Sequence, residues 1–152
     1  MRKIKKIYIH HSAYSGKHGI EDIRRWHLDR GFSDIGYHFV IEKDGTIKRG
    51  RPVEQIGAQV KGDNQDSLGI CLCGDFEKEV VTQDMFGSLI TLCISLVNVF
   101  GDIPILGHRD FKQAKTACPG KHLYSLLDDL RARVKYHYLK REFDCPSGGV
   151  RD

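Results

Sequence analysis

Three residues of the chain could together hold a metal ion: His10, His108 and Cys118. His10 follows a β-branched and aromatic segment, residues 4–9, which predicts a strand. His108 follows a second predicted strand, residues 103–106, and Cys118 lies in the loop after it. Because strand ends at one edge of a sheet bring distant residues together, we expect these three side chains to be neighbours.

Two neutral imidazoles and a thiolate form a tetrahedral zinc shell with an open fourth position, which is typical of a catalytic site. Zinc lowers the pKa of a bound water to about 7 and polarises a carbonyl group, as hydrolysis of an unactivated amide requires. Eight histidines in 152 residues also produce such triples by chance. A second interpretation therefore stays open, in which the histidines cap strands and the thiol is an inert packed group.

The apolar periodicity predicts a single α/β domain over residues 1–143, followed by a flexible tail over residues 144–152. A central mixed β-sheet is flanked by helices, and the zinc site lies at the C-terminal ends of the strands. The predicted strands are residues 4–9, 37–42, 46–48, 68–73 and 103–106, and the predicted helices are residues 20–29, the segment between Thr82 and Gly101, and residues 123–138.

The composition is that of a folded domain with a modest positive charge. Apolar residues make up 40% and charged residues 29%, and the net charge of +4 favours anionic partners. That charge does not choose between acidic cell-wall polymers and nucleic acid. The five cysteines are odd in number and lack the spacing of a disulfide framework, which indicates a reducing compartment.

The chain lacks the pattern of an export signal. Only three apolar residues, Ile7 to Ile9, precede His10, which is too few for a signal-peptide core. The longest apolar run, residues 89–100, is shorter than the roughly 20 residues that span a bilayer. We expect a cytoplasmic protein without a membrane segment.

Five motifs follow one another along the chain: IYIHHSA at residues 7–13, GYHF at 36–39, KGDN at 61–64 with SLGI at 67–70, GHRD at 107–110, and TACPG at 116–120. In this order they resemble the type 2 N-acetylmuramoyl-L-alanine amidases, which include small phage lysozyme-type amidases and the peptidoglycan recognition proteins. The resemblance covers about residues 4–130. It implies hydrolysis of the amide bond between N-acetylmuramic acid and L-alanine of bacterial peptidoglycan, with one zinc ion per chain on His10, His108 and Cys118.

Two further residues are catalytic candidates through this resemblance. Tyr37 corresponds to a family tyrosine that supports catalysis, where its hydroxyl would orient the attacking water or stabilise the oxyanion. Without the resemblance, a strand tyrosine with its ring in the core is the simpler interpretation. Thr116 stands where some members carry lysine, and its hydroxyl can bond the oxyanion without adding positive charge.

Four residues are predicted to contact the substrate: Gln59, Lys61, Asn64 and Arg109. Many relatives carry histidine at the position of Gln59, whose amide can donate and accept hydrogen bonds but cannot transfer a proton. The cationic side chains are suited to carboxylates of the stem peptide, and arginine would make a bidentate contact. Plain surface exposure without a role is an equally good interpretation of these residues.

The neighbouring histidines are weaker candidates. His11 is a possible supporting residue beside the ligands, if the strand end bends toward the cleft. His38 follows Tyr37 directly, so it faces the opposite side of its strand and is left out of the site. The remaining cysteines, at positions 71, 73, 93 and 145, receive no functional role.

Several functions remain open beside the main prediction, which is a monomeric phage or prophage endolysin that reaches the wall after the host membrane is permeabilised. One alternative is a thiol hydrolase with Cys118 as nucleophile and a histidine as base. Another is a non-catalytic peptidoglycan receptor, or a protein with a regulatory protein partner. A third is a cytoplasmic amidase that recycles wall fragments. Peptidoglycan or muropeptides are the expected partners, and nucleic acid is not.

Overall fold

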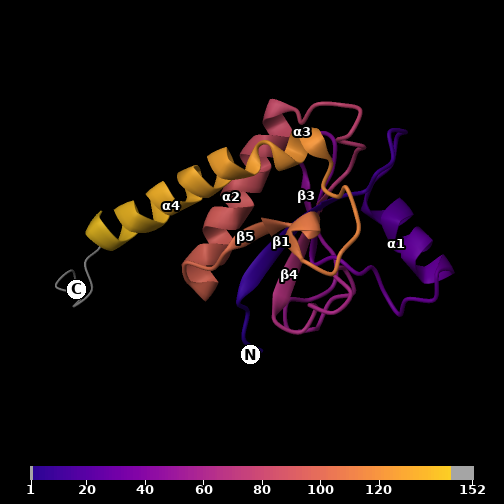
Figure 1. Cartoon of the computed structure of the whole chain (residues 1–152), viewed down its shortest axis with the longest axis horizontal. Coiled ribbons are helices and arrows are strands. Elements are labelled where there is room, and N and C mark those ends of the chain that lie inside the picture. Colours follow the sequence, from indigo (N-terminus) through magenta and orange to yellow (C-terminus); the bar gives the residue numbers. More distant parts are fainter. Residues whose placement is uncertain (1, 145–152) are drawn as a thin grey trace.

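A computed structural model describes residues 2–144 of the chain, and residues 145–152 of the predicted tail lie outside the described residues (Figure 1). The elements are, in order, β1 (Lys6–His11), α1 (Ile20–Asp29), β2 (Phe39–Ile41), β3 (Ile47–Arg49), β4 (Ser67–Leu72), α2 (Gln83–Phe100), β5 (Ile105–Gly107), the 3-10 helix η1 (His108–Asp110), α3 (Lys121–Tyr124) and α4 (Leu127–Asp144).

The strands form one five-stranded sheet in the order β3-β2-β4-β1-β5. Only the β2–β3 pair is antiparallel, and the other three pairs are parallel, so the sheet is mixed. The predicted α/β class with a central mixed sheet and flanking helices is confirmed.

The register places the metal-ligand candidates at one edge of the sheet. Strand β1 lies between β4 and β5, with His10 opposite Cys71 and Ile9 opposite Gly107. Because β1 and β5 are parallel, their C-terminal ends meet at the same edge. His108, which directly follows Gly107, is thereby brought beside His10.

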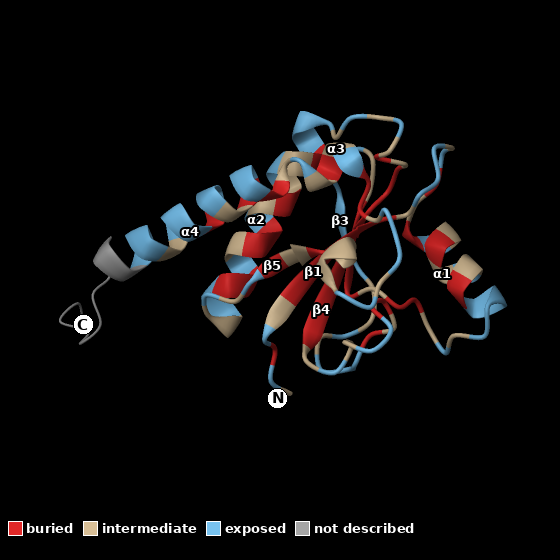
Figure 2. Ribbon diagram, in the orientation of Figure 1, coloured by how far each residue is buried: buried red, intermediate tan, exposed pale blue. Residues whose placement is uncertain are grey.

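The two faces of the sheet are covered by different helices, with α2 and α4 on one side and α1 on the other (Figure 1). Alternation along β1 directs Ile7 and Ile9 into the larger core under α2 and α4. The smaller core joins Ile20 and Ile23 of α1 to Val40 of β2 and to the cysteines of positions 71 and 73. Figure 2 shows buried residues along β1 and β4 and an exposed outer face on α4.

Helix α2 begins at an N-cap, Thr82, whose hydroxyl accepts from the Met85 backbone N–H. By length and composition this helix could also cross a membrane, and a third of that window is buried in the fold. The expectation of no membrane segment therefore stays a prediction. The side chains that α2 buries are Met85, Leu89, Leu92, Cys93, Leu96 and Val97.

All five predicted strands and the last predicted helix differ from the observed bounds by one residue or more. Strand β1 includes both His10 and His11 instead of ending before them. Strand β2 begins at Phe39 and not at Tyr37. The Tyr37 carbonyl oxygen accepts from the backbone N–H of Arg51, which lies in the loop after β3. The last predicted helix is two helices, since a tight turn after Tyr124 ends α3 before α4 begins.

Candidate metal and catalytic site

The three predicted metal ligands come together in the folded chain. Their ligand atoms all lie within 4.8 Å of one another. His10 Nδ1 is 3.6 Å from Cys118 Sγ, and the ring centroids of His10 and His108 are 4.7 Å apart. His10 lies in β1, His108 opens η1, and Cys118 is supplied by the loop before α3.

Backbone contacts hold the Cys118 loop against the end of β5. The Arg109 N–H donates to the carbonyl oxygen of Cys118 at 3.0 Å, which ties the loop to the residue beside His108. The Cys118 N–H in turn donates to the Thr116 hydroxyl oxygen at 3.1 Å. Two ligands that are separate in sequence are therefore fixed to one short stretch of backbone.

Burial keeps the ligand side chains uncharged in the absence of a cation. Burial, together with the neighbouring His108, lowers the pKa of His10 to about 3. At neutral pH the imidazole is therefore uncharged and carries a hydrogen on only one of its two nitrogens. Burial also lowers the pKa of His108 and raises the pKa of Cys118 to about 12. Neutral imidazoles and a thiol that a divalent cation would convert to thiolate are a donor set that fits one zinc ion.

The same burial bears on Cys118 as a nucleophile. A thiol with a raised pKa is protonated at neutral pH, and the thiolate is the nucleophilic form. The protein surroundings therefore disfavour the thiol-hydrolase alternative, although His10 lies within reach of the sulfur.

Tyr37 lies beside the candidate ligands, half-buried, with its ring centroid 5.0 Å from that of His10 and 5.3 Å from that of His27. Burial raises the pKa of its hydroxyl well above the ordinary value for tyrosine. The hydroxyl is thus protonated at neutral pH, and the Cys71 side chain is its hydrogen-bonding neighbour.

A cavity of about 650 Å³ opens over the three ligands. Most of the residues predicted from the sequence line it, but Arg109 does not. The Arg109 guanidinium lies 3.6 Å from the ring centroid of Tyr124, and its Nε is buried without a hydrogen-bond partner among residues 2–144. The predicted residues in the lining are His10, His11, Tyr37, Gln59, Lys61, Asn64, His108, Thr116 and Cys118.

Two of the predicted substrate contacts use their side chains inside the protein. Gln59 Oε1 lies 2.5 Å from His10 Nε2. Asn64 Oδ1 accepts from the backbone N–H groups of Gln59 and Val60 at 2.9 and 2.8 Å. The Lys61 side chain is exposed at the cavity. Substrate contact by these residues stays a prediction.

The side chains of His11 and His38 both form hydrogen bonds with backbone groups. His11 Nδ1 accepts from the Phe76 N–H at 3.0 Å, although its ring also borders the cavity. His38 is buried, and its Nδ1 accepts from the Gly69 N–H while its Nε2 contacts the Gln55 carbonyl oxygen. His38 is absent from the cavity lining.

Six residues of the lining were not predicted, and three of them carry larger side chains and lie in α1 or directly after it: His27, Arg30 and Phe32. His27, in the last turn of α1, accepts from the Gly36 N–H, which fixes the segment before Tyr37. Arg30 brings a cation to the cavity wall. A single sequence contains no signal for these residues, because the packing of α1 beside the sheet decides which of its side chains reach the cavity.

Comparison with known proteins identifies the family to which this sequence is similar. A family model described as N-acetylmuramoyl-L-alanine amidase matches residues 1–121. The chain is 34% identical over 121 residues to an endolysin of Klebsiella phage KP32, covering 75% of this chain and 79% of the relative. It is 35% identical over 120 residues to an endolysin of Enterobacteria phage T3, covering 74% and 78%.

A solved structure is similar over most of the chain. The N-acetylmuramoyl-L-alanine amidase LysC from Clostridium intestinale superposes with a TM-score of 0.80 at 36% identity, covering 88% of this chain and 87% of LysC. The wild-type Drosophila peptidoglycan recognition protein LB gives a TM-score of 0.76 at 31% identity, covering 84% and 81%.

Proposed function

We propose that this chain, which belongs to the N-acetylmuramoyl-L-alanine amidase family, is a zinc-dependent hydrolase of the bond between N-acetylmuramic acid and L-alanine in peptidoglycan. The family that the five sequence motifs resembled is thereby confirmed. The observation that supports the zinc dependence is the convergence of His10, His108 and Cys118 within 4.8 Å.

The ligand residues have separate tasks in this proposal. The two buried imidazoles present lone pairs without a charge, and Cys118 contributes the anionic sulfur. When bound, zinc would supply a water of lowered pKa and polarise the scissile carbonyl. The burial of His10 also excludes bulk water from one side of the site.

Tyr37 and Thr116 are proposed to support the reacting carbonyl group. Both line the cavity, and both carry hydroxyls that are protonated at neutral pH. Donors that face the oxygen on which negative charge develops lower the barrier to amide hydrolysis. The Thr116 hydroxyl oxygen already accepts from the Cys118 N–H, so its own hydrogen is available for such a bond.

The cavity wall is suited to an anionic peptide. Arg30 and Lys61 are cations on the lining, and stem peptides carry carboxylates. A related structure, of peptidoglycan recognition proteins LCa and LCx, is described with tracheal cytotoxin bound. We therefore propose that muropeptides or intact peptidoglycan occupy this cavity.

The biological role proposed is that of a phage endolysin, which acts on the wall once the host membrane is permeabilised. The endolysins of phages KP32 and T3 support this role, because each aligns with this chain over more than three quarters of its own length. Receptor function is the second candidate, since several similar structures are peptidoglycan recognition proteins. The complete His-His-Cys set favours catalysis over recognition alone.

The test is to incubate the zinc-loaded protein with intact peptidoglycan and to measure new N-terminal L-alanine. Activity should disappear with a chelator, return with zinc, and be lost in Cys118→Ser together with bound zinc. Cys93→Ala removes another buried thiol, on α2, and should retain zinc. Activity that persists without zinc would refute the metal-dependent mechanism, and protein that binds the wall without releasing L-alanine would establish a receptor.

A further inference from the structure

The amide of Gln59 contacts one of the three metal-ligand candidates directly. Gln59 Oε1 and His10 Nε2 are 2.5 Å apart, and both residues are buried. The other nitrogen of the same ring, Nδ1, lies 3.6 Å from Cys118 Sγ and so faces the candidate metal position. The two nitrogens of His10 therefore have different environments, one inside the protein and one at the site.

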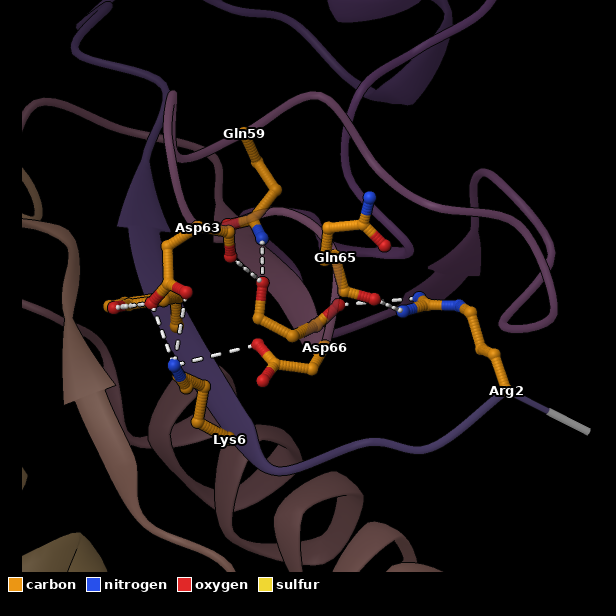
Figure 3. Close-up of polar contacts among 8 residues, drawn as sticks. Arg2, Lys6, Gln59, Asp63, Gln65 and Asp66 are labelled. Carbon is orange, nitrogen blue, oxygen red and sulfur yellow. Dashed lines mark hydrogen bonds and ion pairs between the residues drawn. The ribbon is translucent and has the colours of Figure 1, made fainter.

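A second hydrogen bond determines which way the Gln59 amide points. Gln59 Nε2 donates to Ser67 Oγ at 2.8 Å, and the Ser67 hydroxyl donates to the Asp63 carbonyl oxygen at 2.7 Å (Figure 3). Because the Ser67 hydrogen is used on Asp63, its oxygen must accept from the amide nitrogen. The amide oxygen then faces His10, whose Nε2 must carry the hydrogen. Nδ1 is left with a free lone pair.

The segment that carries Gln59 is tied to the same face of the same strand. Lys6, Tyr8 and His10 alternate along β1, so their side chains share one face. The Asp63 carboxylate accepts from Lys6 Nζ at 2.8 and 3.0 Å and from the Tyr8 hydroxyl at 2.6 Å. Figure 3 shows Asp63 between Lys6 and Gln59. The strand that presents His10 thus also anchors the residues that orient it.

The Gln59 side chain occupies space that is free because residue 69 is a glycine. A Cβ atom added at Gly69 would lie 2.7 to 2.8 Å from the Gln59 side chain, closer than real Cβ contacts. Gly69 lies on β4 directly opposite Tyr8 of β1. The Gln59 side chain therefore lies flat against the sheet, where its position is restricted by packing as well as by hydrogen bonds.

We infer that Gln59 is a positioning residue for His10, which holds the imidazole in the Nε2–H tautomer and directs the Nδ1 lone pair to the metal. This role rests on the proposed zinc site and differs from the substrate contact predicted from the sequence. Groups that orient a metal-bound imidazole typically contribute about 10- to 100-fold in metal affinity.

The experiment combines two measurements on the full chain. Long-range proton–nitrogen NMR of the zinc-free, ¹⁵N-labelled protein reports which His10 nitrogen carries the hydrogen. Competition with a chelator reports zinc affinity. We expect Gln59→Leu to lose the single tautomer and to bind zinc about 10- to 100-fold more weakly. Gln59→Glu keeps an acceptor for His10 and should retain both properties.

Gln65→Leu is the matched control, because it is the same substitution at an exposed side chain of the same segment. It should leave the tautomer and the zinc affinity unchanged. If Gln59→Leu keeps the wild-type tautomer and affinity while Cys118→Ser loses zinc, the inference on Gln59 is overturned and the proposed function survives. If the wild-type protein binds no zinc, both fail.

Discussion

The Nδ1 atom of His10 lies 3.6 Å from the sulfur of Cys118, although the two residues are 108 positions apart in the chain. Three structural facts produce this contact: β1 lies next to β5 in the sheet, the two strands are parallel, and the Cys118 loop is bonded to Arg109 just after β5. The site therefore depends on the register of the sheet. Substitutions at different positions around it are expected to affect substrate binding, the chemical step or the stability of the fold separately.

Tyr37→Phe removes one hydroxyl and leaves the ring that packs beside His10. We expect kcat to fall by about 100-fold, the size of effect seen when one oxyanion donor is removed. Bound zinc should be unchanged, because the tyrosine is not a ligand. Tyr136→Phe removes an exposed hydroxyl on α4 and should leave kcat unchanged. An unaltered kcat in Tyr37→Phe would exclude a catalytic role for this hydroxyl.

Arg30→Ala and Lys61→Ala should each raise KM for muropeptides, with little change in kcat. The expected rise is about fivefold, since an exposed charge contact contributes up to about 1 kcal/mol. Arg109→Ala should leave KM unchanged, because its guanidinium stacks on Tyr124 outside the cavity lining. Arg25→Ala, on the outside of α1, is the control for total charge. A raised KM in Arg109→Ala would instead restore the substrate contact predicted from the sequence.

The same substitution at two glycines should have opposite effects on stability. A Cβ at Gly36 would lie 2.0 Å from the Ala58 carbonyl oxygen, so Gly36→Ala should destabilise the fold by about 3 kcal/mol or more through overpacking. Gly87 lies inside α2, and apart from the adjacent helix backbone no atom of residues 2–144 lies within 4 Å of an added Cβ. Gly87→Ala should stabilise the fold by about 0.5–1 kcal/mol. Urea unfolding of the two variants measures both changes in the free energy of unfolding. Equal changes in the two variants would refute the close approach at Gly36.

His38 should make the protein sensitive to mild acid. Burial lowers the pKa of His38 to about 4, below the ordinary value of 6.5 for histidine. Between these two pKa values, His38 binds a proton more readily in the unfolded chain than in the folded protein. The stabilising contribution is complete above about pH 6.5 and falls as the pH drops toward 4, by roughly 1.4 kcal/mol per pH unit.

Urea unfolding of the zinc-free protein, from about pH 7 to about pH 4.5, measures this contribution. His38→Asn removes the titrating ring and keeps an acceptor for the Gly69 N–H. The variant should lose less stability than the wild type as the pH falls. Because the other histidines are present in both proteins, the difference between the two curves reports His38. Parallel curves would mean that His38 does not titrate in this range.

Features that depend on neighbouring residues could be predicted from the amino-acid sequence. Alternating apolar residues defined β1, the N-cap at Thr82 began α2, and the five ordered motifs identified the family and its three ligand candidates. These signals are local, because a strand, a helix start or a motif is encoded within a few residues.

Contacts between side chains that are distant in the sequence depend on the folded structure. The orientation of α1 brought Arg30 to the cavity, and stacking on Tyr124 kept Arg109 away from it. The packing of residues 57–67 on one face of β1 joined Gln59 to His10. Such contacts form between segments that are distant in sequence, so they follow from the register of the sheet and the space left at positions such as Gly69, which local patterns do not encode.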